Sequence, residues 1–392
     1  MTDQETALLP GPVNTPNRRR IEERGVRFSN AFCNTPQCSP ARSALLTGME
    51  PHQTGVLTNV DAGSLGKPLR PDMLNIGSVL RAEGYRTGYF GKWHLGDEGG
   101  DLRAYGFDAY GPGKDDIAAA KAAKWIAAQT EPWLAWVSVL NPHDIYDLAA
   151  VRQTAPRAAV RPPSTGLANL TGKPAEQQDY VDKDQGKQTR DFSSEDWQRY
   201  RTRYCDLVEL ADRSLGTVLA SVKDWDSTAI VYTSDHGDAL GEHGLPFKGP
   251  FLYEPLIRIP LVISAPWKWK AGARSDLTVQ TDLAPTLASL AGVAWPGKKT
   301  GLDLAQGPTG RDAVFLEYYA KQKWVNPIRT IRTARWKLSW YSSGHQELYD
   351  LQADPQEARN LATDPAATAI RRELESRLDR WRPPLKVEIS GK

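Results

Sequence analysis

Short apolar runs alternate with helical patterns through the first three quarters of the chain. Three runs are continuous in apolar residues and close on polar residues, glycine or proline: 131–141, 227–237 and 257–266. Helical periodicity marks three other segments: 73–83, 115–129 and 195–222. Apolar runs of this kind, separated by helices, are typical of parallel strands that are buried on both faces. We therefore expect an α/β fold with a doubly wound, mostly parallel central sheet, whose catalytic groups gather at the carboxyl ends of the strands.

The pattern changes after a predicted helix at 279–293. A stretch rich in glycine and proline follows, and residues 311–350 then have the pattern of strands and turns. An amphipathic helix is predicted at 364–381. We therefore predict two domains, a catalytic domain at 1–310 and a small α+β subdomain with an antiparallel sheet at 311–392.

Residues 150–200 are rich in Gln, Asp, Pro and Lys. This composition favours a long excursion over the surface rather than a part of the central sheet. Excursions of that length often form part of a substrate entrance.

Composition excludes several classes of protein. Apolar residues make up 40% of the 392 residues and charged residues 24%, and the formal net charge is only +2. No segment reaches the roughly 18 consecutive apolar residues that a membrane span needs, and the N-terminus lacks the pattern of a secretory signal peptide. We expect no nucleic acid partner, no membrane association and, for the chain as written, a cytoplasmic localisation. The oligomeric state is not indicated by the sequence.

Three cysteines, Cys33, Cys38 and Cys205, are too few to form a disulfide framework in a chain of this length. The paired spacings of a zinc site are also absent from the sequence around them. A reactive centre or plain buried thiols remain, and for Cys33 and Cys205 we expect buried structural thiols.

Four polar clusters follow predicted strands: "CSPAR" (38–42), "GKWHLG" (91–96), "NPHD" (141–144) and "SDHGDALGEHG" (234–244). Asp235 and His236 come directly after a predicted strand, and this pair suits a hard or borderline cation or a catalytic base. Lys248 follows one short loop later and could reach an anion. Taken singly, each cluster is weak evidence for a functional site, because an Asp-His pair is more often part of a hydrogen-bonded loop than a set of metal ligands. His52 and His243 are expected to be such loop residues.

Together these clusters resemble the sulfatase family of the alkaline-phosphatase-like superfamily. The resemblance runs from "MTDQ" (1–4) to "ELYDLQADPQEARNLA" (347–362), and "CSPAR" continues into "SALLTG" as it does in that family. A Cys-x-Pro-x-Arg match alone arises by chance, but its combination with "GKWHLG" and "SDHG" does not. The resemblance implies an arylsulfatase-like enzyme, a sulfuric ester hydrolase that releases sulfate and an alcohol or phenol.

The resemblance also implies that Cys38 is converted to formylglycine by a formylglycine-generating enzyme, which recognises Pro40 and Arg42. One hydroxyl of the formylglycine hydrate attacks sulfur, and the other allows the covalent sulfate to leave by C–O cleavage. Such covalent catalysis divides one difficult step into two easier ones.

The remaining motif residues receive their roles from the same resemblance. Lys92 and His94 hold the hydrate and take the proton of its second hydroxyl, while Arg42 steadies the hydrate and the cation. His143 and Lys248 neutralise and protonate the leaving oxygen. Asp235 is both a metal ligand and the base for the attacking hydroxyl.

The implied metal ligands are Asp3, Asp235, His236 and the hydrate at position 38, with Gln4 as a further candidate. The expected cation is calcium. Many sulfatases have Asp-Asp and Asp-Asn where this chain has Asp-Gln and Asp-His, a pattern that resembles choline-sulfatase-like and phosphonate monoester hydrolase-like members. The imidazole makes the site softer, so manganese is an alternative.

Two readings of the substrate follow from this departure. The first is a small-molecule or saccharide sulfate ester, and the second is a phosphonate monoester or phosphodiester that is hydrolysed on the same scaffold.

The family has an apolar strand immediately before its first metal-binding Asp, whereas here Asp3 stands two residues after Met1. The first central strand is therefore expected to be truncated, and if the start at Met1 is genuine, Asp3 lies on a frayed end. A start placed too far downstream is favoured over a genuine start, and this leaves the localisation weakly determined. A third alternative for the function of the chain is an inactive, truncated sulfatase relative that binds anions.

Overall fold

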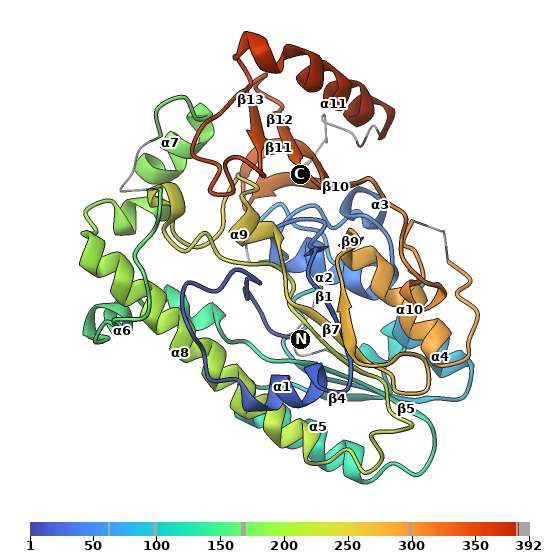
Figure 1. The fold of residues 1–392 in the computed structure, drawn as a ribbon. Helices are drawn as coiled ribbons and strands as arrows, with labels where there is room; N and C mark the ends of the chain where they lie inside the picture. The colour runs from blue at the N-terminus through green and yellow to red at the C-terminus, as the bar shows by residue number, and fades with distance from the viewer. Residues whose placement is uncertain (62, 97–99, 166–169, 298–299, 382, 384–392) are drawn as a thin grey trace.

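The structure is a computed structural model that describes residues 1–61, 63–96, 100–165, 170–297, 300–381 and 383 (Figure 1). One sheet of the α/β part is fully parallel, with β3 (Arg86–Gly91) between β4 (Ala109–Gly111) and β5 (Trp133–Ser138). A short parallel pair is formed by β2 (Ala31–Phe32) and β9 (Thr278–Val279). The predicted α/β fold with mostly parallel strands is confirmed.

A second sheet has the order β6 (Ile230–Thr233), β7 (Leu261–Ser264), β1 (Val26–Phe28) and β8 (Gly272–Arg274). The expectation that the run at 257–266 forms a parallel strand is wrong, because β7 is antiparallel to both β6 and β1. The segment between β6 and β7 contains no long crossover helix in its described structure. It folds as a loop with the short helix α9 (Glu254–Ile257) and returns from the edge at which β6 ends.

Helices surround the two sheets and give the layered arrangement of Figure 1. The predicted helices correspond to α4, α5, α8 and α10, and the excursion at 150–200 contains α6 and α7 in addition to loops. Ser193 caps α8 by accepting a hydrogen bond from the backbone of Asp196 at 3.2 Å, a common start signal of helices. Among the described helices, none is both long and apolar enough to cross a membrane. The helices named so far without bounds, and the first three helices of the chain, are α1 (Pro16–Glu22), α2 (Cys38–Thr47), α3 (Pro51–Thr54), α4 (Ile76–Ala82), α5 (Asp115–Ala127), α6 (Leu148–Gln153), α7 (Ala175–Lys183), α8 (Ser194–Leu219) and α10 (Leu283–Leu290). Short 3-10 turns lie at Leu102–Tyr105, His143–Tyr146, Gln185–Thr189, Glu242–Gly244, Gln280–Asp282, Leu304–Gln306 and Pro365–Ala367.

The C-terminal part of the chain forms an antiparallel sheet at the top of Figure 1. Its strands pair in the order in which they occur in the sequence. Its strands are β10 (Ala313–Lys321), β11 (Trp324–Thr333), β12 (Trp336–Tyr341) and β13 (Gln346–Asp350). Helix α11 (Thr368–Trp381) packs Leu374 and Leu378 against apolar side chains of this sheet, such as Ile331. The predicted domain boundary between residues 310 and 311 stays a prediction, and the last residues of the predicted subdomain lie outside the described part of the chain.

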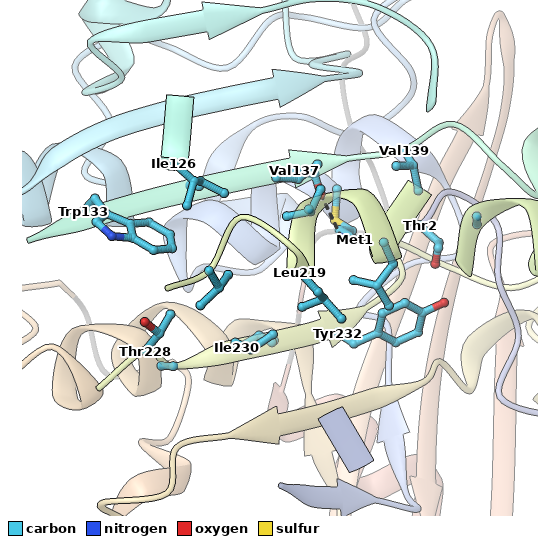
Figure 2. Close-up of a pocket in the computed structure, with 17 residues that line it drawn as sticks. Met1, Thr2, Ile126, Trp133, Val137, Val139, Leu219, Thr228, Ile230 and Tyr232 are labelled. Carbon is cyan, nitrogen blue, oxygen red and sulfur yellow. Dashed lines mark hydrogen bonds between the residues drawn. The ribbon is translucent and has the colours of Figure 1, made fainter. Parts of the chain in front are cut away.

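A gap separates β5 from β6, and in the described part of the chain no strand pairs with the two facing edges. Only Met1–Asp3 bridges them: the Met1 amino group donates to Val137 O at 2.8 Å, and Thr2 forms a parallel bridge with Ser234. The gap contains a cavity of about 120 Å³ with a mainly apolar lining (Figure 2). Consequently β5 is only partly buried over Trp133–Val137, whereas we expected burial on both faces.

The gap lies where we expected the truncated strand. The expectation of a frayed Asp3 is wrong, because Asp3 is fully buried and forms ion pairs with Arg42 and Lys92. Burial lowers the pKa of the Met1 amino group to about 5, so a charge at this place in the sheet is unfavourable.

An apolar extension joined to Met1 should therefore stabilise the fold. We expect about five added residues of the type Val-Ile-Val-Ile-Val to pair with β5 and β6 and to raise the Tm by roughly 5 °C or more. The measurement is thermal unfolding followed by circular dichroism. A matched extension of alternating Ser and Asp should leave the Tm unchanged or lower it, and equal Tm values for the two extensions would contradict the prediction.

The two parts of the chain meet at a titratable cluster. Trp381 Nε1 donates to Glu50 Oε1 at 3.1 Å, and His52 Nδ1 lies 2.9 Å from Glu317 Oε2. Burial, together with the nearby Glu317 carboxylate, raises the pKa of Glu50 to about 7. The folded state therefore favours the protonated form of Glu50, and this contribution to stability is lost as the pH rises from about 4.5 through about 7.

Glu50→Gln should make the stability less dependent on pH. The neutral amide keeps an acceptor for Trp381 and has no charge to bury, so we expect the variant to gain about 2 kcal/mol over the parent at pH 8 and little at pH 5. Chemical unfolding at both pH values measures this. The exposed Glu23→Gln serves as the control, and a parallel pH dependence of Glu50→Gln and the parent would refute the assignment.

Candidate active site

Cys38 is the first residue of helix α2, so the start of this helix positions its side chain. Gln37 is extended and Pro40 lies in the first helical turn, where a missing N–H costs little. Gly48 ends the helix with a φ of 65°, a conformation that favours glycine. A group at the start of a helix lies in a field that stabilises negative charge, so position 38 is suited to an anion.

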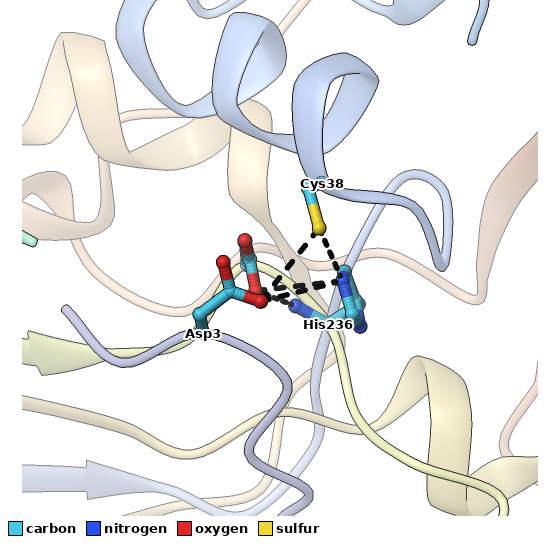
Figure 3. A group of neighbouring side chains, drawn as sticks. Asp3, Cys38 and His236 are labelled. Atoms are coloured by element: carbon cyan, nitrogen blue, oxygen red, sulfur yellow. Dashed lines mark hydrogen bonds and ion pairs between the residues drawn. The ribbon is translucent and has the colours of Figure 1, made fainter. Parts of the chain in front are cut away.

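Four side chains with metal-binding atoms converge here: Asp3, Cys38, Asp235 and His236 (Figure 3). All four are fully buried, and their ligand atoms lie within 4.8 Å of one another. Cys38 Sγ is 3.3 Å from His236 Nε2 and 3.6 Å from Asp3 Oδ1. The His236 ring also lies 2.8 Å from Gly237 O through Nδ1, which leaves Nε2 directed at the cluster. Two carboxylates and an imidazole form a donor set that fits a divalent cation of hard or borderline character.

Arg42 holds the two carboxylates in place. Its guanidinium donates to Asp3 Oδ2 at 2.9 Å and to Asp235 Oδ2 at 3.0 Å. The third nitrogen donates to Lys92 O and to Ser138 Oγ, each at 2.7 Å. The guanidinium therefore fixes both acidic ligands from the side of helix α2.

Two lysines place positive charge over Cys38. Lys248 Nζ lies 3.0 Å from Cys38 Sγ, and Lys92 Nζ lies 3.7 Å from the same atom and 2.6 Å from Asp3 Oδ2. Burial and the Asp3 carboxylate act to raise the pKa of Cys38, but Lys248, Lys92 and His236 outweigh them and hold it well below its usual value. The site therefore stabilises negative charge at position 38.

Gln4 lies beside the cluster with its side-chain amide engaged on both sides. Gln4 Oε1 accepts a hydrogen bond from Lys248 at 2.9 Å, and Nε2 donates to Asp238 Oδ2 at 2.7 Å. Burial raises the pKa of Asp238 to about 6, and its carboxylate also accepts from Tyr200. Sequence reasoning missed Asp238 as a support of Gln4, although it is the second Asp of "SDHGDALG". A ligand role for Gln4 stays a prediction.

Both predicted site histidines, His94 and His143, line a pocket of about 500 Å³ together with Lys92 and Lys248. His94 Nε2 lies 2.7 Å from Asp61 Oδ1, a partner for which the sequence contained no signal. The hydrogen bond to Asp61 helps to raise the pKa of His94 against the opposing effect of burial. Burial lowers the pKa of His143 to about 3. Lys92 and Lys248 line this pocket and also contact Cys38, so they connect the pocket to the buried cluster, while the roles of the individual residues stay predictions.

The side chains that we expected outside the chemistry lie apart from this cluster. Cys33 and Cys205 are buried free thiols, as predicted. His52 is bonded to Glu317, as expected for a structural histidine. His243 is a hydrogen-bonded loop residue, as expected, because its backbone N–H donates to Thr165 Oγ1 at 2.6 Å. Its buried ring packs against Tyr253, with 4.2 Å between the ring centres.

Comparison with known proteins identifies the family. A family model described as Sulfatase matches residues 1–293. The chain belongs to the sulfatase family. A second model, described as N-sulphoglucosamine sulphohydrolase, C-terminal, matches residues 241–383 of this sulfatase.

Relatives of this sulfatase include both kinds that its Asp-Gln and Asp-His pattern resembles. It is 28% identical to a delta 4,5-hexuronate-2-O-sulfatase of Bacteroides thetaiotaomicron, over 92% of this chain and 82% of the relative. It is also 28% identical to a choline-sulfatase of Rhizobium meliloti, over 93% and 82% of the two chains. The structure of a phosphonate monoester hydrolase of Agrobacterium radiobacter has the same fold, with a TM-score of 0.81, 24% identity and coverage of 99% and 95%. The predicted fold and the predicted sulfuric ester hydrolase activity are confirmed.

Replacing Arg42 should destabilise the whole catalytic part of this sulfatase. Arg42→Lys keeps the charge but loses the planar set of donors that joins Asp3, Asp235 and Ser138, so we expect a loss of about 3 kcal/mol or more. Urea unfolding at neutral pH measures the loss. Ser138→Ala removes only one of the four bonds and should cost about 1 kcal/mol. Equal losses for the two variants would contradict the role given to Arg42.

Proposed function

We propose that this sulfatase hydrolyses the sulfate ester of a saccharide, with formylglycine derived from Cys38 as nucleophile and a divalent cation beside it. The observation that carries the proposal is the convergence of Cys38 with Asp3, Asp235 and His236, next to Lys92 and Lys248 of the pocket. A relative named for a hexuronate sulfate supports the saccharide part. A formylglycine-generating enzyme is then required during maturation.

The proposed cation is held by Asp3, Asp235, His236 and the modified residue 38, with calcium as the expected ion and manganese as the alternative. When bound, it supplies positive charge that stabilises an oxygen nucleophile at position 38 and the sulfate next to it. Asp235 is the proposed base for the attacking hydroxyl. Burial and the Asp3 carboxylate raise the pKa of Asp235, which favours proton uptake.

The cationic side chains above this position bind the sulfate. Lys92 and Lys248 provide fixed positive charges for the sulfate oxygens, where water is largely excluded. His94, oriented by Asp61, is placed to accept the proton of the second hydroxyl at position 38. His143 is neutral in the unliganded pocket, and a bound sulfate raises its affinity for a proton, so it can donate to the leaving oxygen together with Lys248.

The test compares the enzyme that has been matured by a formylglycine-generating enzyme with its Cys38→Ala variant. We expect aryl sulfate turnover to fall by roughly 1,000-fold or more in Cys38→Ala, because the nucleophile is lost. Cys205→Ala is the matched control and should retain turnover. Mass spectrometry of the peptide containing residue 38 should show the mass of an aldehyde in place of a thiol.

Two further measurements distinguish the alternative metal ions and the alternative substrates. A chelator should abolish turnover, and calcium or manganese added back singly identifies the ion. Rates on aryl phosphonate and phosphodiester substrates are measured in parallel. Much faster cleavage of either substrate would refute the sulfate ester, and a fully matured enzyme without any turnover would favour the inactive relative.

A further inference from the structure

One side of the pocket that contains Lys92 and Lys248 is lined by residues outside the family motifs. Strands β10 and β11 form a hairpin, and its residues Tyr318, Lys321 and Gln322 line the same pocket of about 500 Å³ as Lys92 and Lys248. The antiparallel sheet of the C-terminal subdomain therefore contributes directly to the space in which the alcohol part of the substrate lies.

Lys321 places a third lysine in this pocket. Its side chain is only 12% exposed, and its ammonium group lies 2.8 Å from Asp184 Oδ2 and 4.5 Å from the centre of the Tyr180 ring. An ammonium group has three donor hydrogens, and one carboxylate does not use them all. Burial lowers the pKa of Lys321 to about 8, with Asp184 acting in the opposite direction and Lys248 adding repulsion. A second negative group at this point of the pocket would be stabilised.

Two residues that line the same pocket have a buried amide oxygen with no hydrogen-bond partner among the described residues, Gln37 Oε1 and Gln185 Oε1. Gln37 is 4% exposed and is held by a hydrogen bond from its Nε2 to Thr58 Oγ1 at 3.1 Å. Buried acceptors without donors are unfavourable, so a ligand that brings hydroxyl donors is preferred here.

This arrangement discriminates among sulfate esters. An aryl group offers no donors to Gln37 and Gln185 and no acceptor to Lys321. A quaternary ammonium group, as in choline, would meet repulsion from the lysines of the pocket. A sugar ring with hydroxyls and an acidic group satisfies all three side chains.

We propose that Lys321 determines specificity by binding a second oxyanion, a ring carboxylate or a second sulfate, on a sulfated saccharide whose hydroxyls donate to Gln37 and Gln185. The inference rests on the proposed function and specifies its substrate class as acidic saccharide sulfates.

The test measures specificity with Lys321→Gln and Lys321→Arg. The probes are a sulfated hexuronate and its methyl ester, glucosamine 2,6-disulfate and glucosamine 6-sulfate, and an aryl sulfate. We expect the parent to prefer the acidic member of one saccharide pair by about 10- to 100-fold in kcat/KM, because a charge-assisted hydrogen bond is gained. The preferred pair distinguishes a carboxylate from a sulfate.

Lys321→Gln should abolish this preference mainly through KM while the aryl sulfate rate changes by less than about threefold, and Lys321→Arg should keep it. Lys323→Gln, an exposed position in the turn of the same hairpin, is the matched control. The inference is overturned if the parent shows no preference, or if Lys321→Gln lowers all rates equally. Failure of the proposed function appears separately as absent aryl sulfate turnover. Calorimetric binding of the acidic saccharides to Cys38→Ala, with and without Lys321→Gln, then still tests the inference.

Discussion

The structure depends on one buried guanidinium that joins two buried carboxylates. Asp3 and Asp235 lie far apart in the sequence and are both fully buried, so the Asp3 carboxylate raises the cost of charging Asp235. Arg42 binds both with direct hydrogen bonds and is itself anchored to Lys92 O and Ser138 Oγ. Five segments thereby meet at one point, and the geometry beside Cys38 follows from that meeting.

A second buried network has the same role for the C-terminal subdomain. Glu254 of α9 lies 3.1 Å from Arg332 of β11, and Lys337 of β12 pairs with Glu357 and donates to Leu252 O at 2.6 Å. These side chains are almost completely buried, so the antiparallel sheet cannot shift without exposing unpaired charges. Because α9 follows the loop that carries Lys248, the network connects the antiparallel sheet that contains Lys321 to the segment of Lys248. These buried charges thus hold the antiparallel sheet against the segment around α9.

The segment Met1–Asp3 lies in the gap between β5 and β6. Asp3 is held in place because Met1–Asp3 contacts both strands and Arg42 binds the carboxylate. Our expectation of a frayed end considered only the missing ladder partners. It omitted the side-chain bonds, which hold this short segment where backbone pairing is incomplete.

The sequence by itself determined the fold class, the family and the set of chemical groups, because strand and helix periodicity and the spacing of "CSPAR", "GKWHLG" and "SDHG" are local properties of the chain. It could not show that β7 runs antiparallel, since direction depends on where a long loop returns. Nor could it find Asp61 behind His94, or Lys321 in the substrate pocket. Asp61 and Lys321 lie outside the motifs, and only the tertiary structure brings their charges within reach of the site.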